Sequence, residues 1–187
     1  MGKNVSNVSA AKPRTTGCIC VAPAGTALPV AADGTLSDAF VDMGYISEDG
    51  MTNTISKTTT KIKAWGGDTV LITEDSFEES YKLKLIECKN VDVLKFVFGD
   101  ENVSGDLETG IKVAKTGGNN EGKVIVIDTI LSNNDLQRTV IPDGVISSIG
   151  AITYKANEPI ALDLTIDCKS DASGNTSYEY KKTPAAG

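Results

Sequence analysis

Residues able to carry out catalysis are scarce in this sequence, and the most versatile one is missing. The 187-residue chain contains no histidine, which excludes Ser-His-Asp and Cys-His catalysis and removes the commonest metal ligand. Its four cysteines are Cys18, Cys20, Cys88 and Cys168. A Cys-x-Cys spacing places both thiols on one face of a strand, and no second pair has the spacing of a zinc site. We therefore interpret the cysteines as small apolar strand residues.

Acidic residues approach two known site patterns without completing either. Segment 100–105 matches the start of a calcium-binding loop, but Ile111 stands where such a loop needs its closing bidentate glutamate. The carboxylates between residues 74 and 79 are better explained as a solvated turn than as a glycosidase pair. No glycine-rich phosphate loop follows a strand and opens a helix. We therefore expect no enzyme activity, no catalytic residue, no cofactor and no metal site.

The composition indicates one β-rich domain with an acidic surface. Hydrophobic residues make up 40% and charged residues 23% of the chain, which is ordinary for a folded protein. Many Thr, Val and Ile residues with little Leu favour sheet. The formal charge of −7 disfavours a basic groove for nucleic acid. No apolar stretch is long enough to span a bilayer, so we expect no membrane insertion.

The elements that would position a functional surface begin with an unusual run, residues 52–70. Its Thr and Ile residues favour a strand, yet counting by twos gives polar residues on both faces. Such a strand has weak register and open backbone groups, so it makes most sense if other subunits complete it. Glu48-Asp49-Gly50 is a hairpin turn signal, which predicts a long hairpin over residues 40–63. Trp65 is expected to anchor the base of this hairpin.

The remaining segments predict further strands and one helix. Residues 77–88 and 159–168 alternate in polarity, which predicts two half-buried strands. Residues 123–131 are apolar on both faces and predict a central strand. Segment 142–144, Pro-Asp-Gly, predicts a turn. A helical pattern between cap-forming Asn and Gly residues predicts a short helix over 91–98, with a strand as the alternative.

Together these elements predict a mainly β fold: an antiparallel β-sandwich or barrel-like domain with one short flanking α-helix and a long projecting hairpin. The domain is expected to span residues 17–169. Residues 1–16 are small and polar and predict a flexible N-terminal arm, and residues 170–187 predict a flexible C-terminal tail.

Three segments resemble a known family. They are Gly44-Tyr-Ile-Ser-Glu-Asp-Gly50, Lys63-Ala-Trp-Gly-Gly-Asp68 and residues 81–99 with their Leu-Ile-Glu and Phe-Val-Phe-Gly stretches. In this order they resemble the major tail tube protein of long-tailed (siphovirus-type) bacteriophages, over most of residues 17–168. The resemblance implies homo-hexameric rings that stack into a hollow tube through which DNA passes without specific binding. It also implies tape-measure, terminator and distal tail proteins as partners, and a location in the virion after assembly in the host cytoplasm.

The resemblance assigns two surfaces on this chain. In such proteins a long hairpin and a terminal arm contact the adjoining ring, and sheets of neighbouring subunits join into an inner barrel. A negative wall would let DNA slide through the lumen, and the lumen-facing candidates are Glu78, Asp163 and Asp167. The expected hairpin residues of the inter-ring contact are Ser47, Glu48, Asp49, Gly50, Met51, Thr52, Asn53 and Thr54.

Rival functions predict different features. A monomeric β-sandwich adhesion or carbohydrate-binding module would need an exposed aromatic platform, but the chain has one Trp and 5% aromatic residues. An enzyme is disfavoured by the missing histidine. A related tube from a contractile or secretion machine is closer in class, and the sequence alone does not separate it from the tail tube.

Overall fold

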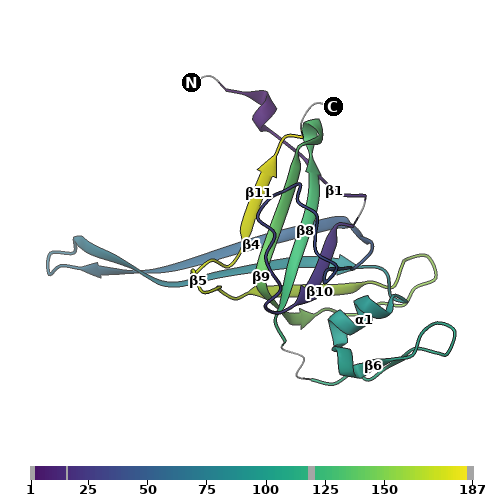
Figure 1. Ribbon diagram of the computed structural model, residues 1–187. Coiled ribbons are helices and arrows are strands. Elements are labelled where there is room, and N and C mark those ends of the chain that lie inside the picture. Colours follow the sequence, from purple (N-terminus) through teal and green to yellow (C-terminus); the bar gives the residue numbers. More distant parts are fainter. Residues whose placement is uncertain (1–2, 16, 118–120, 185–187) are drawn as a thin grey trace.

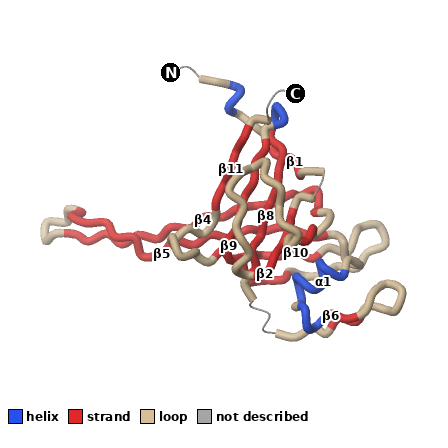
Figure 2. Tube along the Cα trace, in the orientation of Figure 1, coloured by secondary structure: helices blue, strands red, loops and turns tan. Residues whose placement is uncertain are grey.

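The computed structural model describes residues 3–15, 17–117 and 121–184, and its fold is mainly β (Figures 1 and 2). One α-helix and three short 3-10 helices accompany the strands in these residues. The main sheet contains β1 (Ala11–Pro13), β2 (Ile19–Pro23), β3 (Val41–Asp42), β4 (Ile46–Lys63), β5 (Thr69–Leu85), β8 (Lys123–Leu131), β9 (Leu136–Ile149), β10 (Leu162–Cys168) and β11 (Tyr178–Lys182). A separate pair joins β6 (Val103–Ser104) to β7 (Lys112–Val113); the helices are α1 (Val91–Phe98), η1 (Val5–Asn7), η2 (Asp100–Asn102) and η3 (Ser132–Asn134).

The main sheet is antiparallel and open. Its strand order is β3-β2-β8-β9-β10-β5-β4, with β1 added to β8 and β11 added to β9. In Figure 1, β8, β9 and β11 run across the direction of β4, β5 and β10. Because β3 and β4 lie at opposite ends of the order, the described strands do not close into a barrel. The mainly β, antiparallel class predicted from the sequence is confirmed.

Strand β9 changes partner along its length. Its first half pairs with β11 and its second half pairs with β10. The change occurs at Pro142-Asp143-Gly144, so the turn predicted there is wrong: the chain stays extended and only its neighbour changes. Gly144 is needed at this point because a Cβ atom would lie 2.7 Å from Ile125 Cδ1.

The core lies between the crossing parts of the sheet and helix α1. Leu83 and Leu85 of β5 are opposite Leu164 and Leu162 of β10, and all four are buried. Residues 124–127 of β8 are buried on both faces, and β8 lies between β2 and β9, as the apolar run predicts. Burying such side chains stabilises the fold by roughly 1.5–3 kcal/mol each.

The outer face of β8 and β9 carries a buried ion pair. Arg138 donates to both carboxylate oxygens of Asp128 at 2.7 Å. The same guanidinium donates to the backbone carbonyls of Ala31 and Gly34. It thereby holds the loop between β2 and β3 across this face. Arg14 adds a longer contact to Asp128 at 3.3 Å.

Helix α1 occupies the residues that its capping pattern predicts. The Asn90 side chain accepts a hydrogen bond from the backbone N–H of Asp92, and Gly99 ends the helix at a φ of 98°. The buried residues of the helix, among them Val93, Leu94 and Val97, join the core cluster. The helix therefore covers one end of the core.

The hairpin differs from its prediction. Residues 46–63 form one strand, β4, which pairs with β5, so the hairpin spans residues 46–85 and not 40–63. The pairing passes from Ile46↔Leu85 to Met51↔Leu83, which makes residues 47–50 a bulge. A bulge and a tight turn both use a glycine of positive φ, here Gly50 at 71°. The Glu48-Asp49-Gly50 signal therefore predicted a turn where the structure has a bulge.

Both terminal segments contain strands. Residues 11–13 of the expected flexible arm pair with Thr129 to Leu131 of β8. Residues 178–182 of the expected flexible tail pair with Leu136 to Val140 of β9. Residues 1–2, 16 and 185–187 of these two segments lie outside the described residues. No helix in the described residues is long and apolar enough to cross a membrane.

Candidate functional site

The projecting arm, which we define as residues 52–77, is the most exposed element of the protein. Every residue from Thr52 to Asp75 is exposed. From Thr69 to Glu79, β5 pairs only with β4, so both edges of the ribbon are unpaired there among the described residues. An isolated two-stranded ribbon has little stability of its own, and its open edges invite another strand. The arm therefore has the form of a surface that a neighbouring molecule completes.

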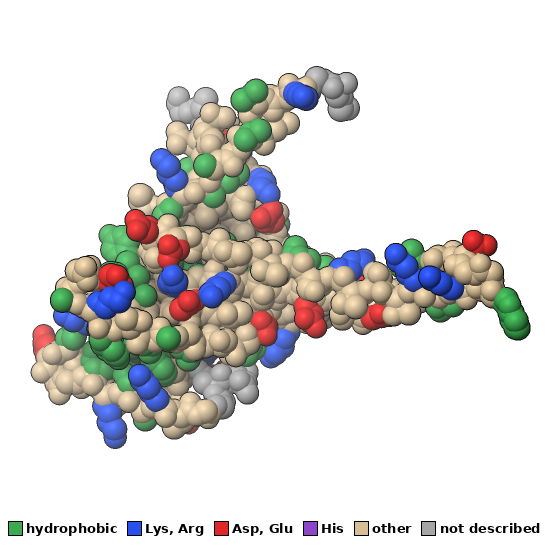
Figure 3. Space-filling model, turned by 180° about the vertical axis from the view of Figure 1, so that it is seen from behind, with side chains coloured by type: hydrophobic (Ala, Val, Ile, Leu, Met, Phe, Trp, Pro, Cys, Tyr) green, Lys and Arg blue, Asp and Glu red, His purple; other side chains and the backbone are tan. Residues whose placement is uncertain are grey.

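The two faces of the arm differ in chemistry. Directly paired residues share a face, so the pairs Thr54↔Ser80 and Thr60↔Thr73 belong to one face and Lys57↔Phe77 belongs to the other. The first face is rich in hydroxyl groups. The second face carries lysines and exposed apolar side chains, and Figure 3 shows basic, acidic and apolar side chains interspersed along the arm. Its members are Ile55, Lys57, Lys61, Ile72, Glu74 and Phe77.

The arm ends in a turn that exposes the only tryptophan of the chain. The backbone N–H of Ala64 donates to the carbonyl of Asp68 at 2.8 Å, and Gly67 adopts a φ of 93°. Trp65 in this turn is fully exposed. Trp65 was expected to anchor the base of the hairpin. That expectation is wrong, because the turn that connects the two strands contains Trp65 itself. The tip, residues 64–68, therefore holds one large apolar side chain far from the domain.

The expected inter-ring residues lie at the root of the arm. Ser47, Glu48, Asp49 and Gly50 form the bulge, and Met51, Thr52, Asn53 and Thr54 pair with β5 beside the domain. At the bulge, Lys84 donates to Asp49 at 2.6 Å and holds the pKa of that carboxyl below its usual range. Residues 47–54 thus set how the arm leaves the domain, and they do not form its tip.

A buried carboxylate, Glu79, ties the root of the arm to the C-terminal segment. It accepts hydrogen bonds from Asn53 at 2.7 Å, Tyr81 at 3.0 Å, Ser177 at 3.0 Å and the hydroxyl of Thr176 at 2.5 Å. Burial raises the pKa of Glu79, but the four donors together outweigh burial and lower it below its ordinary value. The charged carboxylate is therefore the stable form in the folded protein.

Sequence reasoning missed Glu79, which it placed in a solvated turn. The signal was present in the alternation, since Glu79 shares a strand face with the buried Tyr81 and Leu83. Glu74, Asp75 and Glu78 lie close to it in sequence, and this run of acidic residues suggested that all of them were exposed. Two of its hydrogen-bond donors, Thr176 and Ser177, also lie almost 100 residues away in sequence, so no local pattern identifies them.

The three acidic residues proposed for a lumen wall lie on one face of the sheet. Asp163 is opposite Lys84, and Asp167 is opposite Ser80. Glu78 lies two positions before Ser80 in β5, on the same face. This outer face is opposite to the one that carries the core residues. Lys82 lies 3.6 Å from Asp163, so the surface is mixed in charge and not purely acidic. The structure thus places the three carboxylates on one face, spread along six positions of β5, and the lysines on this face reduce their negative potential.

Comparison with known proteins identifies the family. A family model described as "Phage tail tube protein" matches residues 1–183 of the chain. The chain belongs to the phage tail tube protein family. A search of curated proteins finds no significant match. The resemblance of the sequence motifs to a phage tail tube protein is confirmed.

Membership gives the tail tube protein a structural role in the phage tail, within the virion. The family is not a class of enzymes, and a tail tube implies assembly with other tail proteins. The projecting arm and the polar outer face of the sheet are the two surfaces that such a role can use.

The thiols of this tail tube protein are poorly suited to chemistry. All four cysteines are free. Burial raises the pKa of Cys18 and of Cys20 to about 11, and that of Cys168 to about 12. These three thiols are therefore protonated at neutral pH and weakly nucleophilic. Within the described ranges, no group of three or more Cys, Asp or Glu residues is arranged to hold a metal ion.

Proposed function

We propose that this tail tube protein assembles into homo-hexameric rings that stack into the tail tube of a siphovirus-type phage and form the conduit for DNA ejection. The exposed arm carries this proposal. Residues 52–75 are all exposed, and both strand edges of this ribbon lack a partner strand among the described residues. A ribbon of this kind gains stability when neighbouring subunits cover it.

The proposed inter-ring contact uses the whole arm. The resemblance gives the hairpin this role, and the exposure of its distal part, centred on the tip at 64–68, supports a contact of that part with the adjoining ring. Residues 47–54 at the root then orient the arm. The N-terminal arm contributes as well, since Val5 and Val8 are exposed beside η1. The outer edges of β3 and β4, which no other described strand pairs, are available to join neighbouring sheets into an inner barrel.

The proposed lumen wall is the outer face that carries Glu78, Asp163 and Asp167. Hydroxyl groups and paired charges cover this face, and the whole chain has a net charge of −7. A wall without a strong positive potential does not hold the phosphate backbone, so DNA passes without specific binding. The tape-measure, terminator and distal tail proteins are the proposed partners of the tube, and assembly takes place in the host cytoplasm.

Removing the distal arm tests this proposal. Ser56 and Glu78 are paired, so residues 57–77 can be replaced by a two-residue Asn-Gly turn that joins them directly. We expect the shortened chain to keep its far-UV circular dichroism and cooperative unfolding, and to form no tubes in negative-stain micrographs over a concentration series. Polymerisation equal to that of the parent would contradict the role of the arm.

A mixing experiment provides the control. Shortened copies keep the surface that receives an arm, so adding them to the parent should shorten the tubes in proportion to their fraction. A parent chain that remains monomeric at high concentration would instead favour an adhesion or carbohydrate-binding module. The structure offers little to such a module, because the exposed Tyr45, Trp65 and Tyr154 lie on separate elements.

A further inference from the structure

We infer that Trp65 at the tip of one copy's arm seats in the apolar hollow between α1 and strands β2 and β3 of a second copy. The inference rests on the proposed function, because it names the receiving site for the arm. Trp65 is fully exposed at the end of the longest projection. Tryptophan is among the residues that most often anchor protein interfaces.

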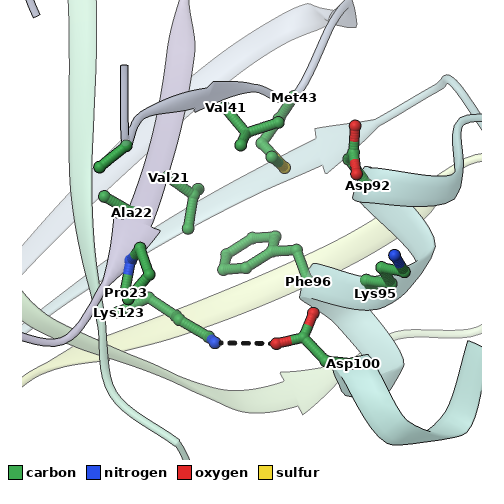
Figure 4. A pocket seen from close by; sticks show the side chains of 11 residues that line it. Val21, Ala22, Pro23, Val41, Met43, Asp92, Lys95, Phe96, Asp100 and Lys123 are labelled. Carbon is green, nitrogen blue, oxygen red and sulfur yellow. Dashed lines mark hydrogen bonds and ion pairs between the residues drawn. The ribbon is translucent and has the colours of Figure 1, made fainter. Parts of the chain in front are cut away.

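The receiving hollow is apolar and has the size of an aromatic ring system. Its walls are Val21 and Ala22 from β2, Val41 and Met43 from the β3 region, and Phe96 from α1, which points toward β2 (Figure 4). Its volume is about 190 Å³. A dry cavity of about 150 Å³ binds benzene, so this hollow accommodates a larger ring.

The charges at the edge of this hollow are balanced. Asp92 and Asp100 lie there with Lys95 and Lys123, and Asp100 holds Lys123 at 3.3 Å. Lys61 and Lys63 lie just before the tip, and neither has an ion pair within the described part of the chain. Docking of Trp65 would bring these two lysines toward an edge that has two carboxylates as well as two lysines, so the encounter meets no net repulsion.

A second apolar hollow lies on the other side of α1, and its charges oppose the same docking. Leu94, Phe98 and Tyr154 are among its lining residues. Its charged lining residues are Lys89 and Lys115, and Lys115 lies 5.5 Å from the centre of the Phe98 ring. Lys61 and Lys63 beside the tip would meet lysines here, with no carboxylate among the described lining residues. The hollow between α1 and β2, whose charges are balanced, is therefore the more favourable of the two.

The geometry requires two copies. The arm and helix α1 project from opposite sides of the domain (Figure 1), and the stretch from Thr52 to Lys63 extends about 40 Å at a strand rise of about 3.3 Å per residue. A chain cannot bring its own tip to its own hollow. In the proposed tube each copy gives its tip to one neighbour and receives the tip of another, which is a heterologous contact, the type that generates closed rings or continuous stacks.

The emission of Trp65 tests the inference directly, because it is the only tryptophan of the chain. On assembly of the full-length protein we expect a blue shift of the emission maximum and a loss of quenching by acrylamide. Tubes whose tryptophan stays as accessible as in the monomer would overturn this inference and leave the proposed function standing. Failure to assemble under every condition would instead remove the proposed function.

Matched variants identify the hollow. Val41→Asp places a charge in its wall at a partly exposed position, and Tyr154→Asp does the same in the other hollow. We expect Val41→Asp to raise the critical concentration for assembly roughly 30-fold, as loss of an interface anchor does, and Tyr154→Asp to leave it unchanged. Circular dichroism of each monomer checks folding. Unimpaired assembly of Val41→Asp, or equal impairment by both changes, would overturn the assignment.

Discussion

Replacing Glu79 by alanine removes the acceptor on which four donors converge at the root of the arm. Asn53 and Ser177 are partly exposed and can turn to water, but Tyr81 and Thr176 are buried. A buried polar group left without a partner costs about 1–3 kcal/mol. Two such groups give an expected loss of about 4 kcal/mol, within a range of roughly 2–6.

Urea unfolding followed by far-UV circular dichroism measures this loss, at protein concentrations that keep the chain monomeric. Glu78→Ala is the matched control, since Glu78 is the adjacent glutamate in β5 and is exposed. Its unfolding free energy should stay within about 0.5 kcal/mol of the parent. If Glu79→Ala matched this control, the network would not be a stabilising element and the reasoning would be refuted.

The pH dependence gives the same prediction a second readout. The folded protein holds the pKa of Glu79 below its ordinary value of 4.5, so its carboxylate contributes stability that is fully present above that value. This contribution is lost as the pH falls through the folded pKa. The difference in unfolding free energy between the parent and Glu79→Ala should therefore be constant near neutral pH and shrink below about pH 4.5. A difference that grew on acidification would contradict the assigned charge state.

Two further changes address the fold and the outer face of the sheet. Arg138→Met leaves the buried Asp128 with the longer contact to Arg14 as its remaining ion pair among the described residues, so we expect a loss of about 3 kcal/mol in the same urea assay, largely recovered when Asp128 is replaced by leucine as well. Exchanging Glu78 and Asp167 for lysine should make assembled tubes retain added DNA at low salt and release it at high salt, as measured by co-sedimentation. Retention equal to that of parent tubes would argue against a lumen position for this face.

Local signals predicted the elements whose causes are local. The capping residues of α1 and the alternation of β10 lie within the segments they describe, and both elements were predicted correctly. The hairpin failed because Gly50 meets the backbone requirement of a turn and of a bulge equally well, and only the partner strand distinguishes them. Pro142 misled in the same way, at a point where β9 exchanges β11 for β10.

The candidate surfaces were predicted unevenly for related reasons. Glu78, Asp163 and Asp167 share a face because strand alternation and antiparallel register are regular, so outward positions on neighbouring strands meet. Residues 47–54 moved from the expected tip to the root once the turn moved to 64–68. The Glu79 network could not be predicted, because Thr176 and Ser177 reach it only through the fold.

The bulge at residues 47–50 is a short hinge about which the whole arm can rotate. A bulge bends its strand and increases the local twist, and the arm beyond it is about 40 Å long at the rise of a strand. A rotation of about 10° at the bulge would therefore displace the tip by roughly 7 Å over that length. The Lys84–Asp49 ion pair links this bulge to β5. In the proposed tube, the four residues of the bulge would therefore set the twist from one ring to the next and how far the tail can bend.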